Sequence, residues 1–160
     1  MNSPDAVPDS TRSDADPPVI GWREWVGLPE LGIAHIKAKI DTGARTSALH
    51  TFSLEVAEEA GVRTARFGVH PFQRDSDTIV WCRAPVIDER SVRDSGGHRE
   101  WRFVIATQIE MAARRWPVEI TLTARDNMLF RMLVGRTAMR GMRIDPTASF
   151  VTGVPAPGPR

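Results

Sequence analysis

Apolar and polar residues alternate along several short stretches of this chain, with the period of two that is typical of a half-buried β-strand. Within residues 34–40, Ala and Ile alternate with His and Lys. The same alternation predicts strands over residues 63–69, 101–106 and 118–123, and residues 20–28 and 78–84 are further candidates. Turn-forming residues separate these runs, namely Gly61, Ser95-Gly96-Gly97 and Asp126-Asn127.

Helical periodicity is weak by comparison. Residues 137–141 could form one short helix, and residues 53–61 contain helix formers although a strand fits them equally well. Many short strands separated by turns indicate an all-β fold, either a closed barrel or a sandwich, with at most one or two short helices.

The composition of the two ends differs from that of the middle. Residues 1–18 are rich in Asp, Ser and Pro, and we expect a disordered leader there. Residues 154–160 are rich in Pro and predict a flexible tail. The body between them, residues 19–153, is short enough for one domain with one core.

Charge and cysteine content narrow the function classes. The net charge is only +1, so nothing global points to nucleic acid or to a membrane surface. The single cysteine, Cys82, excludes an intrachain disulfide and a Cys-based zinc cage, and we expect it to be a small buried apolar residue. A lone cysteine, no signal peptide and no long apolar run together predict a cytoplasmic protein.

The strongest chemical signal is Asp41-Thr42-Gly43-Ala44, which follows directly on the alternating strand 34–40. A strand that runs into Asp, followed by a Gly that permits a tight bend, would hold a carboxylate on a rigid base. Thr42 and the Gly43 amide would then donate hydrogen bonds to it. The same three residues also fit an ordinary Asx-turn at the end of a strand.

A second motif favours a chemical role for Asp41 over an ordinary turn. Residues 130–136 end in two apolar residues that are followed by Gly135 and then Arg136, about 90 residues after D-T-G-A. This pair of motifs resembles the retropepsin-like aspartic peptidases. Together with residues 21–26 and 95–100, it is also similar to the bacterial branch of proteins labelled ATP-dependent zinc proteases. The resemblance covers about residues 20–153.

The resemblance implies a closed six-stranded acid-protease barrel that works as an aspartic endopeptidase on peptide or protein substrates, without a cofactor. Such enzymes use two carboxylates that share one proton. This chain has one D-T-G, so the second Asp41 must come from another copy, in a two-fold homodimer. Thr42 and Gly43 would brace the paired carboxylates.

The resemblance also implies a substrate-binding set. Its members are Ala44, Arg45, Ser95, Gly96, Gly97, His98, Glu100 and Arg136. Residues 95–98 have the position of a hairpin that could fold over the site as a flap, although they also fit an ordinary hairpin turn. Asp88 and Asp94 are expected to be surface loop charges.

One position departs from the pattern. Typical retropepsins have an acidic residue after D-T-G-A, and here that position is Arg45. Arg45 and Arg136 would repel each other unless a carboxylate lay between them, and Glu100 is a candidate for that bridge. Alternatively, Arg45 points into the cleft and binds an acidic group of the substrate.

Three further expectations concern partners and rival functions. Similar proteins are linked to an ATP-grasp ligase that adds glutamates to a ribosomal protein, which implies a ligase partner or a Glu-rich substrate. The first rival is a zinc-dependent peptidase that uses His98, Glu100 and His50, because His98 and Glu100 would share one face of a strand. The second rival is a non-catalytic module that binds acidic peptides.

Overall fold

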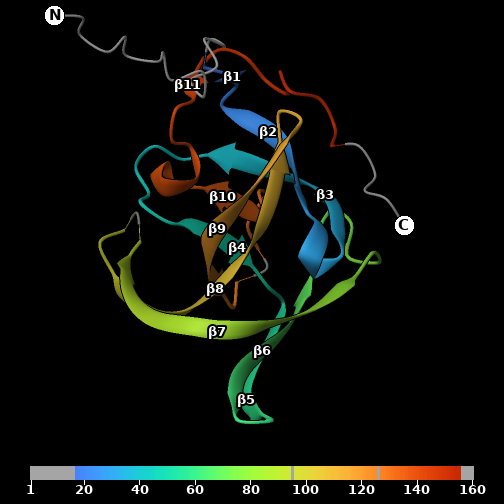
Figure 1. Cartoon of the computed structure of the whole chain (residues 1–160), viewed down its shortest axis with the longest axis vertical. Coiled ribbons are helices and arrows are strands. Elements are labelled where there is room, and N and C mark those ends of the chain that lie inside the picture. Colours follow the sequence, from blue (N-terminus) through green and yellow to red (C-terminus); the bar gives the residue numbers. More distant parts are fainter. Residues whose placement is uncertain (1–16, 95, 126, 156–160) are drawn as a thin grey trace, which may run out of the picture.

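The computed structural model describes residues 17–94, 96–125 and 127–155. The expected leader lies almost entirely outside these residues, as do Ser95 and most of the expected tail. The elements, drawn in Figure 1, are β1 (Val19–Ile20), β2 (Arg23–Leu28), η1 (Pro29–Leu31), β3 (Ile33–Ile40), β4 (Ser47–His50), β5 (Ser53–Glu59), β6 (Val62–Val69), β7 (Val80–Arg93), β8 (Arg99–Met111), β9 (Arg114–Thr123), β10 (Met132–Val134), η2 (Arg136–Ala138) and β11 (Arg143–Ile144).

The predicted all-β class is confirmed. The predicted strands are present as β2, β3, β6, β7, β8 and β9, and residues 53–59 form a strand rather than a helix. The helix expected over 137–141 is the short 3₁₀ helix η2. η1 and η2 are the helical segments within the described residues, which agrees with the expectation of at most two short helices.

The main sheet closes on itself. Its strand order is β2-β3-β10-β4-β9-β8-β7-β6-β5, and β2 also pairs with β8 through Gly27 and Glu110. The first six strands therefore form a ring, in agreement with the closed six-stranded architecture that the resemblance implied. β7, β6 and β5 extend from this ring as antiparallel hairpins, seen at the bottom of Figure 1.

The side chains inside the ring follow the sequence pattern in part. On β3, Ile36, Ala38 and Ile40 are buried and Lys39 is exposed, as the alternation predicts, but Ala34 at the start of the run is exposed. On β8 the alternation fails at its first member, because Trp101 lies near the hairpin end and is 73% exposed. Cys82 is buried as expected, and its thiol donates to the carbonyl of Leu31 at 3.4 Å.

A buried carboxylate joins the two ends of the described chain. Glu24 on β2 is fully buried and accepts hydrogen bonds from the amides of Gly21 (2.7 Å), Val151 (3.0 Å) and Thr152 (3.1 Å), and from the Thr152 hydroxyl (2.9 Å). A carboxylate with this many donors is stable inside a protein. Glu24 therefore ties the C-terminal segment to the ring.

Among the described residues, no helix has the length and apolar character needed to cross a membrane.

Candidate active site

β3 and β10 deliver Asp41 to the edge of the ring. The two strands run parallel, with Ile40 opposite Val134, and the Asp41 amide continues this pairing by donating to the Val134 carbonyl at 2.9 Å. The half-buried carboxylate then accepts a hydrogen bond from the Gly43 amide at 3.0 Å. This contact is the one expected from Gly43. It is also the hydrogen bond of an Asx-turn, so an ordinary turn and a positioned catalytic carboxylate would have the same geometry here.

The Gly-Arg motif packs against the D-T-G loop. The Arg136 amide donates to the Ala44 carbonyl (2.8 Å), and the Thr137 amide donates to the Arg45 carbonyl (3.0 Å). The Arg136 guanidinium donates to the Thr42 carbonyl at 2.9 Å. Two segments about 90 residues apart therefore form one continuous hydrogen-bonded layer.

Gly135 is required at this crossing. A Cβ atom at Gly135 would lie 2.6 Å from the carbonyl carbon of Thr46 and 2.9 Å from the amide nitrogen of Ser47. Both are backbone atoms that cannot move aside. The Gly135 amide also donates to the Ser47 hydroxyl at 3.0 Å, which fixes the start of β4.

Arg45, the arginine at the departing position, is solvent-exposed. The Arg136 guanidinium is satisfied by a carbonyl, that of Thr42, rather than by a carboxylate. Glu100 does not bridge these two arginines: its partners are Arg102 (3.5 Å) and Arg125 (3.4 Å). Glu100 therefore belongs to a different part of the site from the one expected.

That part is the tip of the β7–β8 hairpin. The Asp94 carboxylate accepts hydrogen bonds from the amides of Gly96 (3.0 Å) and His98 (2.9 Å), which lower the pKa of Asp94. Arg125, in the segment after β9, lies 3.6 Å from Asp94 and 3.4 Å from Glu100. Asp94, expected to be a plain surface charge, thus organises the hairpin tip, while Asp88 pairs with Arg90 at 2.8 Å.

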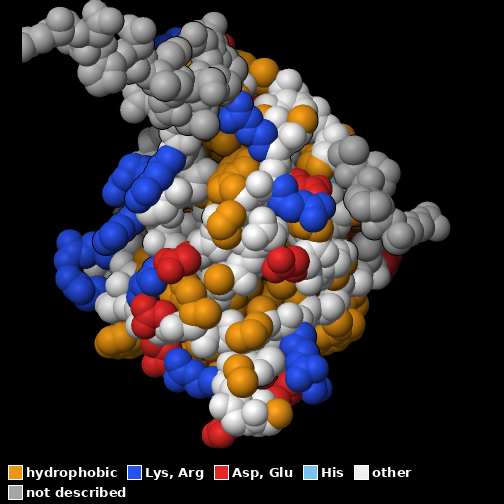
Figure 2. Space-filling model, in the orientation of Figure 1, with side chains coloured by type: hydrophobic (Ala, Val, Ile, Leu, Met, Phe, Trp, Pro, Cys, Tyr) orange, Lys and Arg blue, Asp and Glu red, His pale blue; other side chains and the backbone are white. Residues whose placement is uncertain are grey.

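The D-T-G loop and the hairpin tip face the same edge of the molecule. In Figure 1, the coil of η2, which carries Arg136, and the tip of the β7–β8 hairpin both lie at the left of the view. Figure 2 shows basic side chains gathered along this edge.

A buried histidine lies at the far end of β4. His50 Nδ1 is 2.5 Å from the Thr123 hydroxyl, whereas Nε2 is buried without a hydrogen-bond partner among the residues that the structure describes. Burial, and then the positive charges of Arg102, Arg125 and Arg131, lower the pKa of His50 to about 4. Sequence reasoning missed this basic cluster. The spacing of Glu100 and Arg102 on one strand face was the available signal.

The three residues of the zinc alternative have separate partners. His98 is largely exposed, with its ring 3.7 Å from Asp94, while Glu100 pairs with arginines and His50 bonds to Thr123. Across residues 17–94, 96–125 and 127–155, no group of three or more His, Cys, Asp or Glu side chains is arranged to hold a metal ion. The donor set present does not fit a zinc ion.

A family profile described as the RimB-like family, "Retropepsin-like aspartic endopeptidase RimB", matches residues 19–155. The chain belongs to the RimB-like family. The suspected retropepsin-like relationship is thereby confirmed, over nearly all of the residues that the structure describes.

Two relatives of known name are more than 40% identical to the chain. A protein of Desulfotalea psychrophila is 43% identical over 136 residues, which cover 84% of this chain and 29% of that protein. A protein of Shewanella pealeana is 41% identical over 136 residues, covering 84% and 30%. Each is named "probable alpha-L-glutamate ligase". The chain therefore spans less than a third of the length of these relatives.

A crystal structure from Legionella pneumophila, of a protein with unknown function, has the same fold. Its TM-score is 0.70 at 23% sequence identity, and the match covers 84% of this chain and 98% of that one. At this identity the match supports the fold of the RimB-like chain alone.

Proposed function

We propose that residues 19–153 form an aspartic endopeptidase domain that hydrolyses peptide bonds with the Asp41 carboxylates of two copies of the chain. The observation that carries this proposal is the hydrogen-bonded layer between the D-T-G loop and Gly135-Arg136. This layer leaves the Asp41 carboxylate at the ring edge with the Gly43 amide as its hydrogen-bond donor. Membership of a family described as aspartic endopeptidases supports it further.

The chemistry follows from two carboxylates at close range. In a two-fold dimer, two Asp41 side chains about 3 Å apart cannot both ionise, so they share one proton. The ionised carboxylate takes a proton from a water molecule, which attacks the carbonyl carbon of the peptide bond. The protonated carboxyl polarises the carbonyl oxygen, and a proton then passes to the leaving amine nitrogen as the C–N bond breaks.

The other residues of the site have supporting roles in this proposal. Thr42 and Gly43 hold the carboxylate pair in place, and Ala44, Arg45 and Arg136 line the approach to it. The β7–β8 hairpin, with Ser95, Gly96, Gly97 and His98, acts as the flap, and Glu100 holds its base through Arg125. The ion pairs of Arg125 with Asp94 and Glu100 support a flap that closes by charge pairing.

The substrate class follows from charge. The basic edge and the exposed Arg45 suit an acidic, Glu-rich substrate, because guanidinium groups pair bidentately with carboxylates. The names of the relatives support an association with a glutamate ligase, as a partner or as the source of the substrate. The single buried thiol supports a reducing compartment, the cytoplasm.

The test is a dilution experiment with Asp41→Asn. The variant alone should lose at least about a thousandfold in cleavage of a Glu-rich peptide. In an equilibrated 1:1 mixture with wild type, activity should fall to about a quarter of the undiluted value, because only wild-type pairs have both carboxylates. Independent subunits would instead keep about half.

Asp88→Asn is the matched control, since Asp88 is an exposed carboxylate with a partner of its own. Activity of Asp41→Asn equal to wild type would refute the peptidase and favour the acidic-peptide-binding module. Activity that a chelator abolishes, and zinc restores, would favour the zinc peptidase.

A further inference from the structure

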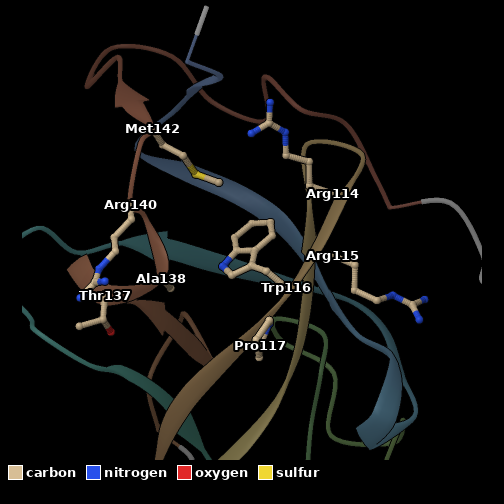
Figure 3. A pocket seen from close by; sticks show the side chains of 8 residues that line it. All are labelled: Arg114, Arg115, Trp116, Pro117, Thr137, Ala138, Arg140 and Met142. Atoms are coloured by element: carbon tan, nitrogen blue, oxygen red, sulfur yellow. The ribbon is translucent and has the colours of Figure 1, made fainter. Parts of the chain in front are cut away.

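A pocket outside the Asp41 site lies between the start of β9 and the segment that includes η2 (Figure 3). Its volume is about 680 Å³, which falls within the range of small-ligand and peptide pockets. Its lining residues are Arg114, Arg115, Trp116, Pro117, Thr137, Ala138, Arg140 and Met142. None of them was a predicted site residue.

The floor of this pocket is apolar. Trp116 projects from β9 into the space toward Ala138 and Met142, whereas Arg115 on the same strand points away (Figure 3). Trp116 and Met142 are half-buried and pack against the core of the ring, so both side chains are held in place from behind. A flat indole beside a thioether suits an aromatic or large aliphatic group.

The rim of the pocket is basic and unneutralised. Arg115 pairs with Glu110, but Arg114 and Arg140 are exposed and form no ion pair within the described part of the chain. No acidic residue lines the pocket. In Figure 3 the Arg114 and Arg140 side chains lie on opposite sides of Trp116. Two separated guanidiniums match carboxylates spaced along an extended chain better than one compact phosphate group.

We propose that this pocket is a second binding site, for an acidic peptide segment that carries one aromatic or large aliphatic side chain. The apolar side chain packs on Trp116 and Met142, and flanking carboxylates pair with Arg114 and Arg140. The inference does not depend on peptide cleavage, because none of its residues belongs to the Asp41 site.

The pocket nevertheless borders that site. Thr137, in its wall, donates its amide to the Arg45 carbonyl at 3.0 Å, so wall and D-T-G loop share one layer of backbone. A peptide that occupies the pocket would therefore contact a wall that is hydrogen-bonded to the segment following Asp41.

The experiment uses the full chain with Asp41→Asn, so that binding is measured without cleavage. The probe is the peptide acetyl-Glu-Glu-Phe-Glu-Glu-amide, and the readout is the indole N–H resonance of Trp116, assigned by its loss in Trp116→Phe. We expect a saturable shift of this resonance. Arg114→Gln combined with Arg140→Gln should weaken binding at least about tenfold, whereas Arg74→Gln, at an exposed arginine in the β6–β7 loop, should not.

Three comparison probes complete the test. The peptide with Gln in place of each Glu and the peptide with Gly in place of Phe should both bind at least about tenfold more weakly. No saturable shift with the acidic peptide, equal binding to the double variant, or equal binding of the Gln peptide would overturn the proposal. If adenosine monophosphate shifted this resonance with an affinity equal to that of the peptide, the result would also overturn the proposal and assign the pocket to a phosphate ligand.

Discussion

The D-T-G loop and the tip of the β7–β8 hairpin face the same edge of the ring but are held by different forces. The loop is fixed by backbone hydrogen bonds of 2.8–3.0 Å to Val134, Arg136 and Thr137. The hairpin tip is fastened to the rest of the molecule by the Arg125 ion pairs at 3.4–3.6 Å. Partly exposed ion pairs contribute little to stability, whereas backbone hydrogen bonds within a sheet break only when the sheet itself unfolds. The D-T-G loop is therefore the firmly held, rigid side of the candidate site, and the hairpin tip is attached more weakly.

The largest expected effect is on the rigid side. Gly135→Ala places a methyl group 2.6 Å from the Thr46 backbone and should destabilise the protein by about 3 kcal/mol, measured by denaturant unfolding. Gly96→Ala in the hairpin is the matched control. Its nearest neighbour, at 3.3 Å, belongs to the exposed His98 side chain, which can move, so unfolding should change by less than about 0.5 kcal/mol. Equal losses in the two variants would remove the contrast between the two regions.

A medium effect is expected from His50, the buried histidine at the end of β4. The pKa of His50 is lowered from 6.5 to about 4 in the folded state, so the unfolded chain binds more protons between these values. The contribution of His50 to the free energy of unfolding is fully present above pH 6.5. It is lost progressively as the pH drops toward 4, and the loss is about 2 kcal/mol at pH 5. His50→Asn should remove this part of the pH dependence, whatever its own stability at neutral pH.

The control is His98→Gln, because His98 is largely exposed. Unfolding free energies at a series of pH values should give the same slope between pH 6.5 and 4 for His98→Gln and wild type. A slope that persists in His50→Asn would show that other groups cause the acid sensitivity.

The smallest expected effect on stability is at the hairpin tip. Arg125→Gln removes both hairpin ion pairs and should cost less than about 1 kcal/mol, because the arginine is 45% exposed. Locally, hydrogen exchange of the Asp94 and Gly97 amides, which bond within the hairpin tip, should become several times faster. Arg63→Gln, which removes the exposed pair with Glu89, should leave these two amides unchanged. Unchanged hydrogen exchange in Arg125→Gln would mean that the hydrogen bonds within the hairpin tip are sufficient to keep it ordered.

Local pattern was enough to predict β2, β3, β6, β7, β8 and β9 and the chemical motifs, but not β4, β10 or β11. The period of two located β3, and the D-T-G and Gly-Arg motifs identified the two segments that meet beside Asp41. The strand order and the ring closure through Gly27 and Glu110 depend on contacts distant in sequence, which alternation does not encode.

The other features that the sequence did not predict also depend on contacts between residues distant in sequence. The three arginines around His50 come from β8, from the segment after β9 and from the residue before β10, so no local window contains them. The Glu100 bridge to Arg136 failed because Glu100 faces Arg102 and Arg125 instead. Glu24 reads as an ordinary polar strand residue, and its burial depends on donors about 127 residues away.

The environment of Cys82 has a practical consequence. Burial raises the pKa of this thiol to about 12, so almost no thiolate exists near neutral pH and alkylating reagents have little to react with. A cysteine placed at the exposed position 98 would then be the sole site for a spin label. A label there would report on the tip of the β7–β8 hairpin, and Cys82 would not need to be removed first.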